Sequence, residues 1–344
     1  MSYPVSVSGS QHFIKAGRGE NQRIDVHAHY IPDFYREILL KSGLSQPDGI
    51  GAIPPWDETT ALQTMDRLGV STAILSISSP GIHFGDDAQA RTLARRLNET
   101  GAGIMEKYPN RFGLFASVPL PDIEGSVQEA VYALDDLGAD GLVFESNHRG
   151  IYLGDPILDP LYQELDRRGT VLFVHPTSPP CNCSPRLAQR YPQPMLEFIF
   201  ETTRSICDMI LSGVLDRFPN IRVLVPHAGA ALPVLAERID LLLPLLGQSK
   251  GISSKSMRDA LRSLHFDLAG APVPELLDAL LQVADHNRIH YGSDFPFTPA
   301  DACISLLQQV QATPLLNQEL RECIFRQNAV ALFPQLDLES PPSD

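Results

Sequence analysis

Two histidines stand one residue apart near the start of the chain, in the segment Arg23-Ile-Asp-Val-His-Ala-His-Tyr30. Apolar and polar residues alternate here, which is typical of a β-strand whose successive side chains point to opposite faces. His27 and His29 would then lie on one face, where two imidazoles can bind the same metal ion. Asp25 shares that face and could orient one of the ligands. The segment therefore predicts part of a metal site.

Later apolar segments also end in residues of the metal-ligand type. His175 ends one such segment, His227 a second and Asp294 a third. Long helical stretches separate these segments, so each ligand is expected at the same end of a different strand. Neutral imidazoles with one carboxylate suit Zn²⁺, with Mn²⁺ or Fe²⁺ as alternatives. The five side chains together predict a metal centre.

The segments that position these ligands follow an alternating pattern. Mostly apolar runs, typical of buried parallel strands, occur near 23–30, 72–78, 112–118, 141–145, 171–176, 222–228, 264–268 and 289–294. Helices are predicted near 57–68, 86–107, 124–137, 157–168, 195–217, 232–245, 274–285, 300–311 and 316–332. Eight strands with intervening helices predict a (β/α)8 TIM barrel, and a doubly wound open sheet is the alternative.

Composition and chain ends limit the classes of protein. Residues 1–22 are polar and predict an N-terminal arm, 23–334 a single catalytic domain, and 335–344 an acidic tail. The formal charge of −14 argues against nucleic acid and anionic membranes as partners. The N-terminus lacks the features of a signal peptide, and no apolar run approaches the roughly 18 residues of a membrane span. We expect a cytoplasmic enzyme.

Four segments of the chain resemble the amidohydrolase superfamily. They are Ile24-Asp-Val-His-Ala-His29, Phe173-Val-His-Pro176, Pro226-His-Ala-Gly229 and Tyr291-Gly-Ser-Asp-Phe-Pro296. The resemblance covers about residues 23–334 and is to the branch that contains aminocarboxymuconate semialdehyde decarboxylase and aromatic acid decarboxylases. Trp56-Asp57, Ser78–Gly81, Phe84–Asp87 and Tyr152–Asp155 are most similar to proteins of the 6-methylsalicylate decarboxylase type.

The resemblance implies a ligand set and a number of metal ions. It implies that His27, His29, His175 and Asp294 bind one ion per chain, Zn²⁺ or alternatively Mn²⁺, and that His227 is an acid/base residue. Binuclear members of the superfamily bridge two ions with a carboxylated lysine on the fourth strand. The five lysines of this chain, at 15, 41, 107, 250 and 255, lie elsewhere. Glu145 ends that strand and could bridge instead, although pairing with Arg149 or a backbone amide is favoured.

The resemblance also implies a reaction. An ortho-hydroxybenzoate, such as 6-methylsalicylate, would bind the ion through its carboxylate and phenolate oxygens and lose CO₂ to give the phenol. The ring carbon then needs a proton, which His227 or Asp294 could supply. The alternative is a metal-dependent hydrolase of a lactone or amide, since such a metal site can also activate water.

Five residues are candidates for substrate binding. Arg238 matches an arginine that, in the semialdehyde decarboxylase, reaches the substrate carboxylate across a dimer interface, so a homodimer is implied. Phe84 and Phe297 follow predicted strands and could stack on an aromatic ring. Trp56 could cover the pocket, and Asn147 could contact the substrate. Each has a structural alternative: a solvated arginine, a core aromatic ring or a loop asparagine.

Overall fold

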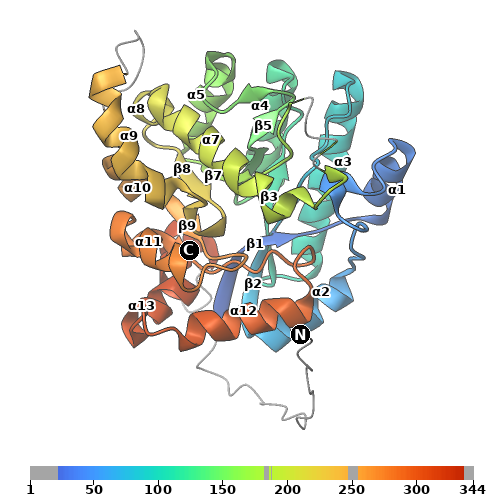
Figure 1. Ribbon diagram of the computed structural model, residues 1–344. Coiled ribbons are helices and arrows are strands. Elements are labelled where there is room, and N and C mark those ends of the chain that lie inside the picture. Colours follow the sequence, from blue (N-terminus) through green and yellow to red (C-terminus); the bar gives the residue numbers. More distant parts are fainter. Residues whose placement is uncertain (1–21, 182–185, 187, 247–254, 337–344) are drawn as a thin grey trace, which may run out of the picture.

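The centre of the protein is a sheet of eight parallel strands surrounded by helices (Figure 1). This computed structural model describes residues 22–181, 186, 188–246 and 255–336. Neighbouring strands pair in the order β1-β2-β3-β4-β7-β8-β9-β10. Their bounds are β1 (Arg23–His29), β2 (Val70–Ser76), β3 (Phe112–Ser117), β4 (Gly141–Glu145), β7 (Val171–His175), β8 (Arg222–Val225), β9 (His265–Asp267) and β10 (Ile289–His290).

The segment that follows β10 returns to β1 and closes the ring of strands. Ala28 pairs in parallel with Phe295. The backbone N–H of Val26 donates to the carbonyl of Tyr291 over 3.0 Å, and the N–H of Asp294 donates to the carbonyl of His27 over 2.8 Å. The predicted (β/α)8 barrel is therefore confirmed, and the open sheet is excluded.

Helices connect the strands and cover the outside of the barrel. They are α1 (Asp33–Lys41), α2 (Glu58–Leu68), α3 (Asp87–Lys107), α4 (Ile123–Asp135), α5 (Asp159–Arg168), α7 (Glu197–Leu211), α8 (Val214–Arg217), α9 (Leu232–Leu246), α10 (Met257–Ser263), α11 (Glu275–Val283), α12 (Ala300–Ala312), α13 (Gln318–Glu322) and α14 (Asn328–Leu332). Asp57, Asp86 and Asp122 begin α2, α3 and α4, because each side chain accepts a backbone N–H from the first helical turn.

Two helical regions differ from the sequence prediction. The helix predicted over 195–217 is interrupted at Gly213, whose φ of 76° is left-handed, so α7 and α8 are separate. Helix α10 was not predicted. Its first turn is capped by Ser256, whose side chain accepts the N–H of Asp259.

Apolar side chains fill the inside of the barrel below its catalytic end. Val26, Phe115 and Phe173 belong to this inner cluster, and Phe333 packs against Phe115 with ring centroids 5.9 Å apart. Ala329 and Leu332 of α14 join the same cluster, so the C-terminal helix covers the end of the barrel opposite the ligands. This core holds the strands rigidly, and a rigid barrel fixes the positions of the side chains at the strand ends.

The predicted arm, apart from Gln22, lies outside the described residues, and so does the predicted tail beyond Leu336. Pro334–Leu336 form a short helical turn in which Leu336 is buried. Within the described ranges, no helix is both long enough and apolar enough to cross a membrane.

Candidate metal centre

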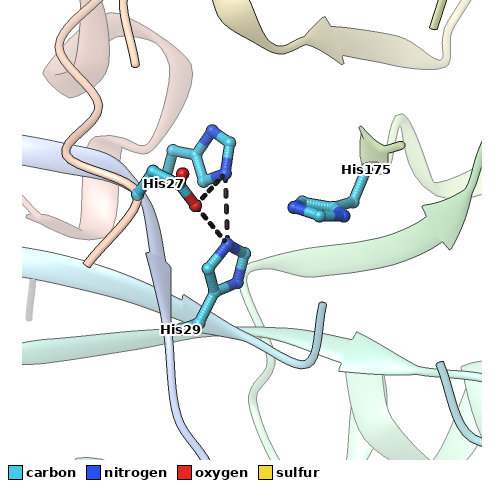
Figure 2. A group of neighbouring side chains, drawn as sticks. His27, His29 and His175 are labelled. Carbon is cyan, nitrogen blue, oxygen red and sulfur yellow. Dashed lines mark hydrogen bonds and ion pairs between the residues drawn. The ribbon is translucent and has the colours of Figure 1, made fainter. Parts of the chain in front are cut away.

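Four predicted ligands meet at the carboxyl ends of the strands. His27, His29, His175 and Asp294 each offer one ligand atom, and these atoms all lie within 4.8 Å of one another. Nε2 of His27 is 3.2 Å from Nε2 of His29, and Oδ1 of Asp294 is 3.1 Å from the His29 nitrogen and 3.5 Å from the His27 nitrogen. Figure 2 shows the ring of His175 facing the other two imidazoles.

The distances within this cluster fit a bound divalent ion. Ligand atoms at 2.0–2.1 Å from a tetrahedral ion stand about 3.3 Å apart. The three separations given above, 3.1, 3.2 and 3.5 Å, bracket that value. Three donor atoms gathered this closely around buried space are the arrangement that a cation stabilises.

In His27 and His29, the ring nitrogen that faces away from the cluster already has a hydrogen-bond partner. Nδ1 of His27 lies 2.8 Å from Oδ2 of Asp267, a carboxylate that can only accept when ionised. Nδ1 of His29 lies 2.9 Å from Oγ of Ser76, whose hydroxyl proton is directed at the carbonyl of Ala28. Both histidines therefore donate through Nδ1 and leave Nε2 with a free lone pair facing the cluster. Partners of this kind orient metal-binding histidines.

Electrostatics favours positive charge at the same place. Burial lowers the pKa of His27, but the carboxylates of Asp267 and Asp294 outweigh it and raise the pKa to about 10. Burial raises the pKa of Asp294, but hydrogen bonds from His27 and His29 hold it well below its usual range. Burial lowers the pKa of His29 and His175. The centre therefore keeps its carboxylates ionised and attracts a proton or a metal ion.

Asp294 and His227 adopt an uncommon backbone conformation. Asp294 has a φ of 60° and His227 a φ of 55°, both in the left-handed region that residues other than glycine rarely occupy. Oδ2 of Asp294 accepts the hydroxyl of Thr298 over 3.1 Å, and the N–H of His227 donates to Oδ1 of Asp267 over 3.0 Å. Such strain is common where a side chain must be aimed at a site.

His227 stands beside the ligands and has a free nitrogen. Its ring centroid is 5.2 Å from that of His27. Its Nδ1 is buried and, among the described residues, has no hydrogen-bond partner. Burial and the neighbouring His27 lower its pKa. A neutral imidazole with an uncommitted nitrogen can exchange a proton with a bound molecule.

A cavity of about 660 Å³ opens above the metal centre. His175, His227 and Asp294 form part of its floor, and Asp48, Ser78 and Ser79 supply a polar edge. The remaining wall is largely apolar and includes Ile50, Pro194, Met195, Phe198, Leu276 and Phe297. Among the described residues that line it, none is arginine or lysine. The cavity suits a small molecule with an apolar ring and a polar group turned toward the metal centre.

Of the five predicted substrate contacts, the structure places Phe297 in this cavity, with its ring centroid 5.5 Å from that of His29. Trp56 lies elsewhere, 6.1 Å from the ring of Tyr30, in the cluster between barrel and helices. Phe84 lines a separate surface cavity beside α3. These two rings pack against apolar neighbours outside the catalytic cavity.

The two polar candidates also lie away from the cavity wall. The amide of Asn147 donates to Glu201 over 3.1 Å and to the carbonyl of Ser178 over 3.2 Å, which ties the hairpin of β5 (Asn147–His148) and β6 (Ile151–Tyr152) to α7. Arg238 is exposed on α9.

Two acidic residues have neighbours that the sequence did not indicate. Asp25 accepts the backbone N–H groups of His27 and Ser293, each over 3.0 Å, rather than an imidazole. Burial raises its pKa to about 6. Asp267, which was not predicted, is the partner of His27. Its signal in the sequence is a carboxylate at the end of the seventh barrel strand.

Known proteins are similar to this chain in sequence and in fold. A 6-methylsalicylic acid decarboxylase of Penicillium expansum is 36% identical over 319 residues, which are 91% of this chain and 97% of that protein. A crystal structure named amidohydrolase II superposes with a TM-score of 0.84 at 35% identity, over 91% of this chain and all of that one. The 5-carboxyvanillate decarboxylase of Novosphingobium aromaticivorans, solved with manganese and 4-hydroxy-3-methoxy-5-nitrobenzoic acid, superposes with a TM-score of 0.82 at 24% identity, over 95% and 100% of the two chains.

The resemblance read from the sequence is confirmed by these relatives. The sequence pattern of the amidohydrolase family matches residues 24–335, nearly the whole of the barrel. Aminocarboxymuconate semialdehyde and γ-resorcylate decarboxylases are also among the similar proteins. The chain therefore belongs to the amidohydrolase family, in the branch whose members include decarboxylases of small carboxylic acids.

Proposed function

We propose that the protein is a metal-dependent carboxy-lyase that converts an ortho-hydroxybenzoate of the 6-methylsalicylate type into the phenol and CO₂. The observation that carries the proposal is the cluster of three imidazoles and one carboxylate, of which His175 and Asp294 line a largely apolar cavity. The similarity to 6-methylsalicylic acid decarboxylase over most of both chains supports the choice of reaction and substrate class.

His27, His29, His175 and Asp294 would hold one ion per chain. Zn²⁺ suits this donor set, and Mn²⁺ is the alternative because it accepts the same imidazole and carboxylate ligands. Manganese in the 5-carboxyvanillate decarboxylase supports that alternative. When bound, such an ion would act as a Lewis acid toward the carboxylate and hydroxyl oxygens of the substrate and would draw electron density from the ring.

The apolar wall of the cavity would hold the aromatic ring. Phe297 stands beside His29, and Phe198 stands beside His175, with ring centroids 6.2 Å apart. Aromatic side chains at these positions can pack against a benzoate ring whose polar edge faces the ligands. A methyl substituent adds apolar surface that this wall can cover. The same wall would exclude water from the ring during the reaction.

Decarboxylation consumes one proton. The bond between ring and carboxyl carbon breaks, CO₂ leaves, and a proton is bonded to the ring carbon. His227 could deliver it from its imidazole ring, and Asp294 could deliver it if its ionised carboxylate first takes up the proton of the substrate hydroxyl. Both residues line the cavity. Variants of the two, discussed below, distinguish the donor.

We also propose a homodimer in which Arg238 acts across the interface. Arg238 lies on an exposed stripe of α9 whose other members are Val234, Leu241 and Leu245, at spacings of four, three and four residues. These apolar side chains are 64%, 66% and 64% exposed. An exposed apolar stripe on one helix is a surface that favours association. A second copy could thus bring an arginine toward a cavity that has no lysine or arginine among its described lining residues.

The test is metal analysis followed by incubation with a panel of ortho-hydroxybenzoates, with CO₂ and phenol as readouts. We expect about one equivalent of Zn²⁺ or Mn²⁺ per chain and conversion of 6-methylsalicylate to the phenol. Benzoates without the ortho hydroxyl are the matched control and should react far more slowly, because they lose one oxygen ligand. Bound metal with hydrolysis of lactones or amides and no CO₂ would contradict the proposal.

A further inference from the structure

The three imidazoles of the metal centre are not held alike. Nδ1 of His27 has Asp267 as its partner, and Nδ1 of His29 has Ser76. Nδ1 of His175 is buried and, in the described part of the chain, has no hydrogen-bond partner. A buried ring nitrogen that carries a proton normally finds an acceptor. The third ligand therefore has a donor position that still needs an acceptor.

The nearest carboxyl oxygen belongs to Glu145. Its Oε2 lies 3.8 Å from Nδ1 of His175 and is likewise buried without a partner among the described residues. The two residues are direct neighbours in the pairing of β4 with β7, so their side chains leave the sheet on the same side. The N–H of Ser146 donates to the carbonyl of His175 over 2.7 Å, which fixes the backbone of both strands at this point.

The surroundings of Glu145 direct its carboxyl group toward His175. Gly81 has a φ of +75°, and a Cβ there would lie 3.3 Å from both Cγ and Oε1 of Glu145. The absence of a side chain at Gly81 thus leaves the room that the carboxyl group occupies. Arg149, which the sequence suggested as its partner, is exposed and forms no ion pair with Glu145 among the described contacts.

We propose that Glu145 is a positioning residue of the metal centre, whose carboxyl oxygen accepts the Nδ1 proton of His175. The inference rests on the proposed metal site. With Nδ1 donating to Glu145, His175 turns Nε2 and its lone pair toward the ion, as His27 and His29 already do. A shift of less than 1 Å brings the two atoms to the usual distance of about 2.9 Å. Glu145 is thereby assigned to the support of a ligand and not to a bridge between two ions.

The first experiment measures Zn²⁺ affinity by chelator competition in the wild type, Glu145→Ala and Glu145→Gln. Loss of a partner of a metal-binding histidine typically weakens binding by about 10–100-fold, which is the change expected for Glu145→Ala. Glu145→Gln should stay within a few-fold of the wild type, because its amide oxygen can still accept the proton. Glu129→Ala is the matched control, since Glu129 is a buried glutamate that binds Asn98 and Arg95 and contacts no ligand.

Equal affinity in Glu145→Ala and the wild type would overturn the inference, and so would an equal loss in Glu129→Ala. A crystal structure of the Zn²⁺-loaded wild type tests it without a variant. A carboxyl oxygen of Glu145 within about 3.0 Å of Nδ1 is expected, and a separation unchanged from 3.8 Å would contradict it. Failure of the wild type to bind Zn²⁺ would overturn the metal site and this inference together. The expected affinities without CO₂ release would overturn only the proposed reaction.

Discussion

Asp267 accepts a hydrogen bond from Nδ1 of His27 over 2.8 Å, and both side chains are fully buried. The other oxygen of Asp267 accepts the backbone N–H groups of His227 and Ala269 over 3.0 and 2.9 Å. One carboxylate therefore orients a predicted metal ligand and fixes the backbone of the predicted acid/base residue. The two functions of the site share this single anchor.

Substitution Asp267→Ala should weaken Zn²⁺ binding by about 10–100-fold, because His27 loses the acceptor that holds its ring and its tautomer. Turnover should fall as well, since the loop that carries His227 loses a hydrogen bond. Metal affinity and kcat are the measurements. Asp259→Ala, at an exposed position on α10, is the control and should change neither. Unchanged metal binding in Asp267→Ala would contradict the role of this carboxylate.

Substitution His227→Ala should leave the metal bound and remove most of the activity. His227 is not one of the four clustered ligands, and loss of an acid/base group typically costs about 10²–10⁴-fold in rate. Metal content and kcat of the same preparation separate the two effects. A metal-free variant would instead place His227 among the ligands.

Substitution Asp294→Asn should abolish turnover while conserving the shape of the side chain. The amide cannot take up a proton and pass it on, as a carboxylate can, and it is a weaker ligand, so activity should be lost even when excess Zn²⁺ restores full metal loading. Single-turnover assays at saturating metal are the measurement. Thr298→Val removes the hydroxyl that binds Oδ2 of Asp294 and should cause a smaller loss. Normal activity in Asp294→Asn would refute the assignment of the site.

Substitution Arg238→Ala should raise KM for the benzoate more than it changes kcat, if the guanidinium of a second copy binds the carboxylate. Leu241→Asp, on the same exposed stripe of α9, should shift the protein to a monomer by placing a charge in the interface. Sedimentation and steady-state kinetics measure the two effects. Unchanged KM in Arg238→Ala would show that this arginine is only a surface residue.

Asp25 gives a prediction for the pH dependence of stability. Its pKa is raised to about 6 in the folded chain, against about 3.9 in the unfolded chain. The folded state then binds more protons between these values, so the free energy of unfolding falls as the pH rises from about 4 to about 6. This contribution amounts to at most about 3 kcal/mol.

Asp25→Asn should lack that fall, because one amide oxygen can still accept the N–H groups that now bind Oδ1. Urea denaturation of the metal-free wild type and variant at several pH values is the measurement. The difference between their free energies of unfolding should shift in favour of the variant as the pH rises to about 6. A difference that does not depend on pH would contradict the raised pKa.

Much of the barrel could be predicted because buried parallel strands are continuous apolar runs and their carboxyl ends carry the ligands. His27 and His29 were recognisable as a pair on one strand, and His175 and Asp294 as single residues at strand ends, and the structure brings the four together. Helix α10 was missed because it has only seven residues, although Ser256 three positions before Asp259 was a capping signal.

Whether a side chain in a loop or helix points into the cavity could not be predicted in this way. Trp56, Phe84 and Asn147 follow the right segments, but their side chains find partners in the surrounding layer of helices and loops. Asp267 was missed for the opposite reason, because its strand contributes only three residues and no second polar residue marks its end as a site. The position of Arg238 relative to a cavity depends on a second copy.

The charge of the cavity wall affects both the binding of the substrate and the release of the product. Its described lining offers carboxyl groups at Asp48 and Asp294 and no cationic side chain. These carboxyl groups disfavour an aromatic acid that arrives as an anion, so we expect a bound ion to strengthen substrate binding. Once CO₂ has gone, the neutral phenol has lost the charge that held it. Loss of CO₂ thus weakens binding of the product relative to the substrate, which favours release of the product after each turnover.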